Sequence, residues 1–265
     1  MPFIETDDIN IYYEKTGEGP SLIFAHGFAG NHLSWWQQIP FFSQSYECVT
    51  YDQRSFGLTK DNIDSPMGRT KFGDDLKSLL DNLNIDKTNI VSHSMGARSA
   101  ISFALKNPER VTSVVISGSN GGSTNDKSRD IRKHHLINVN NNKQRPKALS
   151  DSFIISEPEK TFLFKQIMRI NPHHKKDFLS VNPNLNTSTS LKLNESKIPI
   201  LFMVGNEDTL VNPETIKIAS DLIVNSQFIG LDGVGHSVYY EKPDLYNKLV
   251  MGFLKKHQLE HQTLH

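Results

Sequence analysis

The chain has one cysteine, no excess of charge of either sign and no long apolar run, and each absence excludes something. Among its 265 residues only Cys48 carries a thiol, so no disulfide can form within the chain. Its surroundings, YECVTYD (46–52), are apolar and rich in β-forming residues, so we expect a buried core thiol in a protein of a reducing compartment. The 29 Lys and Arg residues balance 29 Asp and Glu residues, which gives no indication of a nucleic-acid or membrane-surface partner.

Membrane and export signals are also missing from the sequence. No stretch approaches the roughly 18 consecutive apolar residues that a membrane-spanning helix requires. Residues 1–17 lack the basic segment followed by an apolar one that is typical of a secretory signal. We therefore expect a soluble, cytoplasmic protein whose length fits one domain, or one domain with a sizeable insertion.

The chain does contain a regular alternation of short apolar runs with amphipathic segments. This alternation predicts right-handed β-α-β crossovers and a mostly parallel, eight-stranded sheet with helices on both faces. An antiparallel hairpin is expected to open the chain. The strands are predicted at 3–6, 9–15, 20–27, 47–52, 88–94, 110–119, 198–205 and 226–233, and the helices at 70–84, 95–108, 212–223 and 243–257.

Residues 121–195 interrupt this alternation. They hold ten asparagines and thirteen Lys and Arg against seven Asp and Glu, an excess of six positive charges. Because so long a structureless loop would be unusual in a compact domain, we expect a helical cap (121–195) inserted after the sixth strand. Residues 1–120 and 196–265 then form the core domain. The positive charge is typical of a solvated outer face, or of a cap that attracts anionic substrates.

The segment IVSHSMGAR (90–98) passes from a predicted strand into a predicted helix and contains two serines. Its pattern, small-x-Ser-x-Gly, describes the nucleophile elbow, whose strained turn needs small residues two before and two after the serine. Ser92 and Gly96 fill those places around Ser94, whereas Ser92 itself is preceded by Ile90. We therefore expect Ser94 to be the nucleophile. The next amide, that of Met95, would lie at a helix N-terminus and stabilise an oxyanion.

A serine nucleophile needs a base that is held by an acid, and elbow folds place both after later strands in the order serine, acid, histidine. The strand at 198–205 is followed by Glu207 and Asp208, and the last strand is followed by His236. Asp208 is preferred because its loop is expected to face the histidine. Asp232 is close to His236 in sequence, but we expect it to be a turn or surface carboxylate.

Roles can also be predicted for residues outside the Ser94 turn. The loop AHGFAG (25–30) follows the third strand and is expected to supply the second oxyanion donor, the Phe28 amide. His26 is expected to brace that loop, and His93 to point away from Ser94 because side chains alternate along a strand. Further along the chain, the candidates for substrate contacts are Trp35 and Trp36, although packing of a helix on the sheet accounts for at least one of them.

Five motifs follow one another along the chain: HGF (26–28), YDQRSFGLT (51–59), SHSMG (92–96), GNED (205–208) and GVGHS (233–237). In this order and spacing they resemble the α/β-hydrolase superfamily over nearly the whole chain, most of all its small capped esterases, enol-lactone hydrolases and carbon–carbon bond hydrolases. The resemblance implies a triad of Ser94, Asp208 and His236, with an oxyanion hole from the Phe28 and Met95 amides. Ser92 and Ser55 stand where the family has glycine, and neither departure removes a catalytic group.

The expected activity is hydrolysis of small-molecule carboxylic esters through an acyl-enzyme, with no cofactor and no metal. The pairs His134–His135 and His173–His174 lack Cys or acidic partners at metal-ligand spacing, so we expect exposed surface there. One alternative is a carbon–carbon bond hydrolase or enol-lactonase acting on a carboxylate-bearing substrate, which a basic cap would suit. Another is a low-turnover ligand receptor that keeps the triad. We expect a monomer or a homodimer.

Overall fold

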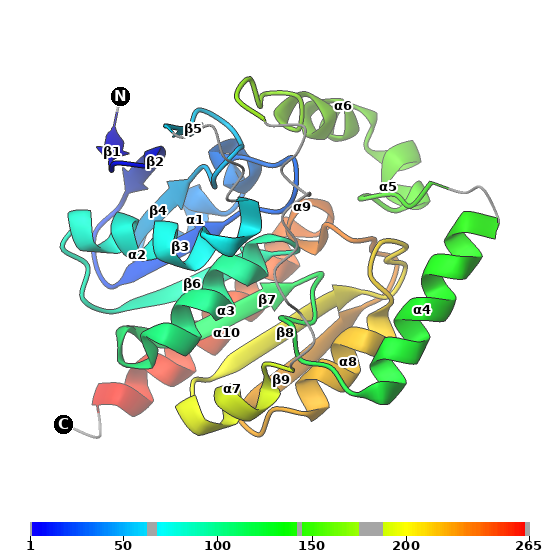
Figure 1. The fold of residues 1–265 in the computed structure, drawn as a ribbon. Coiled ribbons are helices and arrows are strands. Elements are labelled where there is room, and N and C mark those ends of the chain that lie inside the picture. Colours follow the sequence, from blue (N-terminus) through cyan, green and yellow to red (C-terminus); the bar gives the residue numbers. More distant parts are fainter. Residues whose placement is uncertain (1, 63–67, 142–144, 175–187, 263–265) are drawn as a thin grey trace.

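A mostly parallel sheet forms the centre of the molecule and carries helices on both faces (Figure 1). The computed structural model describes residues 2–62, 68–141, 145–174 and 188–262. Within them the strands lie in the order β1-β2-β4-β3-β6-β7-β8-β9, and β5 pairs with β2 as a ninth strand. The strands are β1 (Phe3–Glu5), β2 (Ile9–Thr16), β3 (Ser21–Ala25), β4 (Glu47–Tyr51), β5 (Lys60–Asp61), β6 (Thr88–His93), β7 (Val111–Ser117), β8 (Ile200–Gly205) and β9 (Ser226–Leu231).

The direction of each strand follows the predicted pattern. The neighbours β4-β3-β6-β7-β8-β9 are all parallel, whereas β1, β2 and β5 form an antiparallel edge. Every residue of β6 and β8 is buried, as expected for parallel strands that are covered on both faces. The predicted sheet and its opening hairpin are confirmed, and the two-residue β5 is an addition too short for periodicity to detect.

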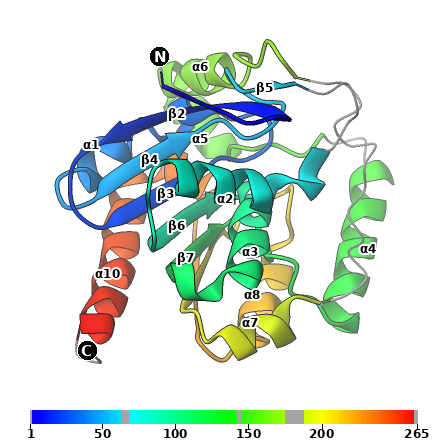
Figure 2. The same ribbon diagram turned by 60° about the vertical axis from the view of Figure 1, so that its left-hand side comes forward.

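Helices from both halves of the chain cover the sheet (Figure 2). One face packs against α2 (Phe72–Asn82), α3 (Gly96–Lys106) and α8 (Pro213–Asp221). The opposite face packs against η1 (His32–Trp35), α1 (Ile39–Phe42), α9 (Val238–Glu241) and α10 (Pro243–Gln262). Cys48 is buried on this second face, as predicted, and burial raises the pKa of its thiol to about 12. None of the helices in the described ranges combines the length and apolar character needed to cross a membrane.

The helices between β7 and β8 are α4 (Asp126–Asn141), α5 (Asp151–Ser156), α6 (Pro158–Ile167) and α7 (Ser190–Ser196). Helix α4 runs beside α8, and α6 lies at the top of the molecule in both views, apart from α4 (Figures 1 and 2). Parts of the predicted cap, residues 142–144 and 175–187, lie outside the described residues. That 121–195 forms a separate cap domain stays a prediction.

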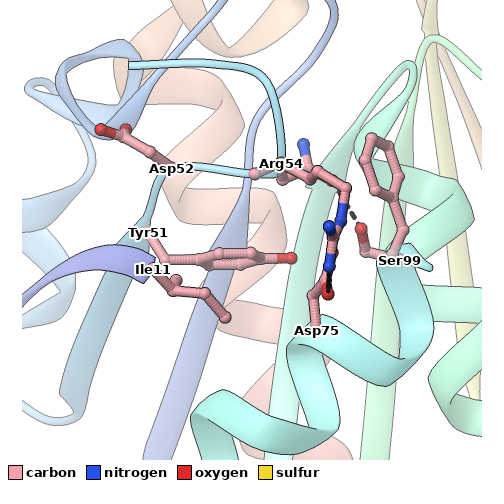
Figure 3. A pocket seen from close by; sticks show the side chains of 8 residues that line it. Ile11, Tyr51, Asp52, Arg54, Asp75 and Ser99 are labelled. Atoms are coloured by element: carbon pink, nitrogen blue, oxygen red, sulfur yellow. Dashed lines mark hydrogen bonds and ion pairs between the residues drawn. The ribbon is translucent and has the colours of Figure 1, made fainter. Parts of the chain in front are cut away.

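A buried ion pair fastens the loop after β4 to helix α2. The Arg54 side chain has no exposed surface, and its Nη2 and Nε donate to the Asp75 carboxylate at 2.6 and 2.9 Å. Figure 3 shows the guanidinium lying over Asp75, with Tyr51 and Ser99 on either side and Asp52 pointing away. Arg54 also reaches Asp8 at 3.2 Å. A guanidinium can occupy such a position because two carboxylates compensate for its lost hydration.

Replacing Arg54 with Met should lower the free energy of unfolding by about 3–5 kcal/mol, because it leaves the Asp75 carboxylate buried without its partner. Urea unfolding followed by circular dichroism measures the change. Lys106→Ala is the control, since Lys106 of α3 pairs with Asp74 of α2 at 2.5 Å on the exposed surface. That variant should lose no more than about 1 kcal/mol. Equal losses in the two variants would contradict this account of the buried pair.

Candidate active site

The turn between β6 and α3 holds Ser94 in a strained conformation. Ser94 has φ +49°, in the left-handed region that costs a non-glycine residue about 1 kcal/mol or more. Its backbone N–H donates to the Ser117 carbonyl at 2.7 Å, which ties the turn to β7. A Cβ on Gly96 would lie 2.2 Å from the Ala25 carbonyl oxygen, so only glycine allows α3 to begin this close to β3. The glycine of the motif therefore has a direct packing reason.

Asp208 and His236 meet across the ends of β8 and β9. Both are buried, and His236 Nδ1 lies 2.7 Å from Asp208 Oδ2. The second carboxylate oxygen accepts the amides of Leu210 and Val211 at 2.8 and 2.9 Å, which fixes its orientation. Asp232 is exposed and accepts a hydrogen bond from Asn206 instead. Of the two aspartates weighed from the sequence, the structure pairs Asp208 with the histidine.

The loop after β3 lies against the Ser94 turn and is braced as the sequence suggested. His26 is fully buried, with Nδ1 2.7 Å from the Gly27 carbonyl and Nε2 accepting the Gln53 amide at 2.9 Å. Phe28 lines the cavity described below. Met95 is the residue that caps the N-terminus of α3, and its side chain packs against Phe56 and Phe72 outside that cavity.

Two asparagines join the loop after β3 to the end of α6. Asn31 Nδ2 donates to the carbonyls of Ile167 and Ile170 at 2.8 and 3.2 Å. Asn171 Nδ2 donates to the Ala29 carbonyl at 2.8 Å, and its Oδ1 accepts the Gly57 amide at 2.7 Å. The loop that carries Phe28 is thus held by the helices inserted between β7 and β8, a connection that no sequence pattern indicated.

His93 has a neighbour that the sequence did not indicate. Strand alternation predicts that it points away from Ser94, and in the structure its ring lies against that of His236. The two rings lie 4.7 Å apart, and His93 lines the same cavity as Ser94. Burial, together with the neighbouring His236, holds the pKa of His93 well below its usual value, so its ring is neutral. His93 therefore lies beside His236 at the cavity, a neighbour that strand alternation alone did not indicate.

Neither tryptophan proposed for substrate contacts lines the cavity. Trp35 is completely buried, and its ring packs between Phe24 and Tyr239 in the core on the second face of the sheet. Trp36 is partly exposed beside Tyr240. Their 3-10 helix begins at His32 and turns Ser34, rather than either tryptophan, toward the cavity. The cavity aromatics that the sequence did not single out are Phe164, Tyr239 and Tyr240.

A cavity of about 440 Å³ opens over Ser94 and His236. Helix α6 and the chain before α5 form one wall, and the loop after Asp208 forms another. None of the described residues that line it is Lys, Arg, Asp or Glu. The lining residues are Gly27, Phe28, Gly30, Ser34, His93, Ser94, Pro146, Ala148, Phe164, Ile167, Met168, Leu210, Val211, His236, Ser237, Tyr239 and Tyr240.

The paired histidines are mostly exposed. His134, His173 and His174 are exposed, and His135 Nε2 lies 3.0 Å from the Thr209 carbonyl. In the part of the chain that the structure describes, no group of three or more His, Cys, Asp or Glu side chains is placed to hold a metal ion.

Comparison with known proteins decides the family. A family model described as alpha/beta hydrolase fold matches residues 20–189, well over half of the chain. The chain belongs to the α/β-hydrolase fold family. This α/β hydrolase is 24% identical over 268 residues to the 2-hydroxy-6-oxo-6-phenylhexa-2,4-dienoate hydrolase of Comamonas testosteroni, over 95% of this chain and 93% of that protein.

Solved structures superpose on this α/β hydrolase over nearly its whole length. One is Est816, described as an N-acyl homoserine lactone degrading enzyme, with a TM-score of 0.77 and 25% identity over 95% of this chain and 100% of that chain. Another is the enol-lactonase of Burkholderia xenovorans LB400, with a TM-score of 0.77 and 19% identity over 96% and 100%. The second likeness concerns the fold alone. The α/β hydrolase thus shares its architecture with proteins of several hydrolytic chemistries.

Proposed function

We propose that this hydrolase cleaves carboxylic esters of small, uncharged acids through a covalent acyl-enzyme. Ser94 attacks the ester carbonyl while His236 Nε2 takes its proton, and Asp208 holds the Nδ1–H of the same ring. The Phe28 and Met95 amides stabilise the tetrahedral oxyanion, each donor contributing roughly 3–4 kcal/mol to the transition state. His236 then returns the proton to the leaving alcohol and activates the water that releases the acid.

The observation that carries the proposal is a 2.7 Å Asp208–His236 pair at a cavity that contains Ser94 but no described charged side chain. A carboxylate on the acyl group would find no cationic partner among the described lining residues, and an unpaired buried charge costs several kcal/mol. The cavity therefore favours an apolar acyl chain. It argues against the carboxylate-bearing substrates considered in the sequence analysis, because the excess positive charge of 121–195 does not reach the described lining.

A matched pair of substrates tests this charge preference. The 4-nitrophenyl ester of heptanoic acid and the 4-nitrophenyl monoester of adipic acid have acyl groups of similar length, and only the second carries a charge. We expect kcat/KM to be at least about 100-fold higher for the heptanoate, which corresponds to about 2.7 kcal/mol. A monoester turned over as fast as the heptanoate would contradict an uncharged acyl site and would favour the carboxylate-bearing class.

A series of 4-nitrophenyl esters from acetate to octanoate, with a lactone and a carbamate alongside, tests the reaction class. We expect sustained turnover of the esters and a rise in kcat/KM with chain length until the 440 Å³ cavity is filled. A single turnover, or none, with strong thermal stabilisation by a small ligand would instead support the low-turnover receptor.

A further inference from the structure

A buried carboxylate outside the proposed triad lies directly behind the histidine loop. Glu241 ends α9 and is only 5% exposed. Its Oε1 accepts the amides of Ser150 and Gly235, both at 3.1 Å. Its Oε2 accepts the Ser150 hydroxyl at 2.6 Å and the Gly235 amide at 3.2 Å. Four contacts from hydrogen-bond donors thus converge on one side chain, and one of the donors belongs to the residue before His236.

The chain on the other side of Glu241 is the segment that leads into α5, residues 147–150. Its Lys147 amide donates to Thr209 Oγ1 at 2.9 Å, beside Asp208. Its Ala148 carbonyl accepts the Ser237 amide at 3.0 Å, beside His236. Residues 147–150 therefore contact both loops of the Asp208–His236 pair, and Glu241 fastens the end of this segment.

Packing leaves little freedom at this junction. A Cβ on Gly235 would lie 2.6 Å from the Ser150 nitrogen and 2.8 Å from Glu241 Oε1. The backbones of Gly235 and Ser150 and the Glu241 carboxylate are therefore in close contact. Ser150 also caps α5, because its Oγ accepts the Phe153 amide at 3.2 Å. The backbone on both sides of His236 is thus hydrogen-bonded, at Gly235 to Glu241 and at Ser237 to Ala148.

We propose that Glu241 is a positioning residue, which holds the His236 loop against residues 147–150 so that the imidazole keeps its geometry toward Asp208 and Ser94. Glu241 does not line the cavity, so it acts on the reaction only through His236. This inference rests on the proposed function, because it assigns Glu241 to the same proposed base. Displacement of a catalytic group by about 1 Å is enough to lower a rate by about 100-fold.

Gln is the conservative replacement at this position. Its Oε1 keeps both amide donors, and its Nε2 donates to Ser150 Oγ, whose own hydrogen can turn toward Ser152 Oγ at 3.1 Å. Ala removes every acceptor and leaves the Gly235 and Ser150 amides without partners. Ser150→Ala removes one contact and the cap of α5 but keeps the Gly235 contact. From E241Q through S150A to E241A, the three variants therefore remove progressively more of the hydrogen bonds that position the His236 loop.

The experiment compares E241Q, S150A and E241A with wild type on 4-nitrophenyl butyrate, at a temperature at which each protein is folded by circular dichroism. We expect kcat within about threefold of wild type for E241Q, about 5-fold lower for S150A and about 30-fold or more lower for E241A. KM should stay within about threefold of wild type in all three variants. Leu193→Ala is the stability control, because Leu193 is a buried core residue of α7 away from the cavity. It should lose stability and keep kcat.

The proposal would be overturned if kcat fell less than threefold in E241A, or if Leu193→Ala lowered kcat as much as E241A does. It would also be overturned if E241Q did not keep kcat near the wild-type value. If E241A does not fold, the kcat values of E241Q and S150A decide. A kcat of S150A equal to that of wild type, or a kcat of E241Q as low as that of S150A, would then overturn the proposal. The downfield proton NMR signal of the His236 Nδ1–H, identified by its loss in His236→Ala, separates this proposal from the proposed function. It should be sharp in wild type and E241Q and broadened or absent in E241A, whether or not the protein turns over esters.

Discussion

Replacing Ser94 with Ala should lower kcat/KM for 4-nitrophenyl butyrate by about 10⁵-fold, with no loss of fold. The attacking oxygen disappears, and the remaining activity comes only from binding and the oxyanion donors. Because alanine tolerates φ +49° no better than serine does, stability should change by less than about 1 kcal/mol. Initial rates at substrate concentrations well below KM measure the effect.

Ser113→Ala is the matched control for this prediction. Ser113 is a buried serine of β7, and its Oγ donates to Asn89 Oδ1 at 2.8 Å, remote from the cavity. That variant should keep full activity and lose about 1 kcal/mol of stability. Ester turnover that survives in Ser94→Ala would mean that the turn after β6 is not the nucleophile elbow.

Replacing Asp208 with Asn should lower kcat by about 10⁴-fold, the second largest effect expected. The Asn Oδ1 can keep the amides of Leu210 and Val211, so the loop should retain its conformation. Its amide group would then face His236 Nδ1 as a donor, which forces the ring proton onto Nε2. In that tautomer the imidazole cannot accept the Ser94 proton.

The same substitution at Asp232 is the control. Asp232 is exposed and lies closer to His236 in sequence than Asp208 does, but its carboxylate binds Asn206. Asp232→Asn should stay within about twofold of wild type. Comparable losses of kcat in the two variants, or a loss confined to Asp232→Asn, would show that the acid has been assigned to the wrong loop.

The positions of the proposed catalytic residues were predictable because each follows a strand of a parallel sheet. Side chains just beyond the carboxyl ends of such strands meet at one edge, and hydrophobic runs show where the strands end. That reasoning located Ser94, Asp208 and His236 without any knowledge of distances. The helix predicted at 70–84 is confirmed as α2, whose Leu76, Leu79 and Leu80 are fully buried.

The contacts that the sequence did not predict depend on how distant segments pack. Alternation predicted that His93 points away from Ser94, but only the fold reveals that its ring lies against His236 at the same cavity. Trp35 follows the loop after β3 directly, yet the turn of η1 buries it in the core. Glu241 and Ser150 are ninety-one residues apart and share no periodic pattern, so their hydrogen bond could not be read from spacing.

The most direct test of the proposed covalent mechanism is to identify the residue that reacts with a 4-nitrophenyl alkylphosphonate. This reagent phosphonylates an activated serine and releases 4-nitrophenol, and the adduct is located by intact mass and peptide mapping. The account predicts one phosphonyl group per chain, carried by Ser94, with labelling strongly slowed in His236→Ala. A label on another residue, or no label in a protein that still turns over esters, would contradict Ser94 as the nucleophile.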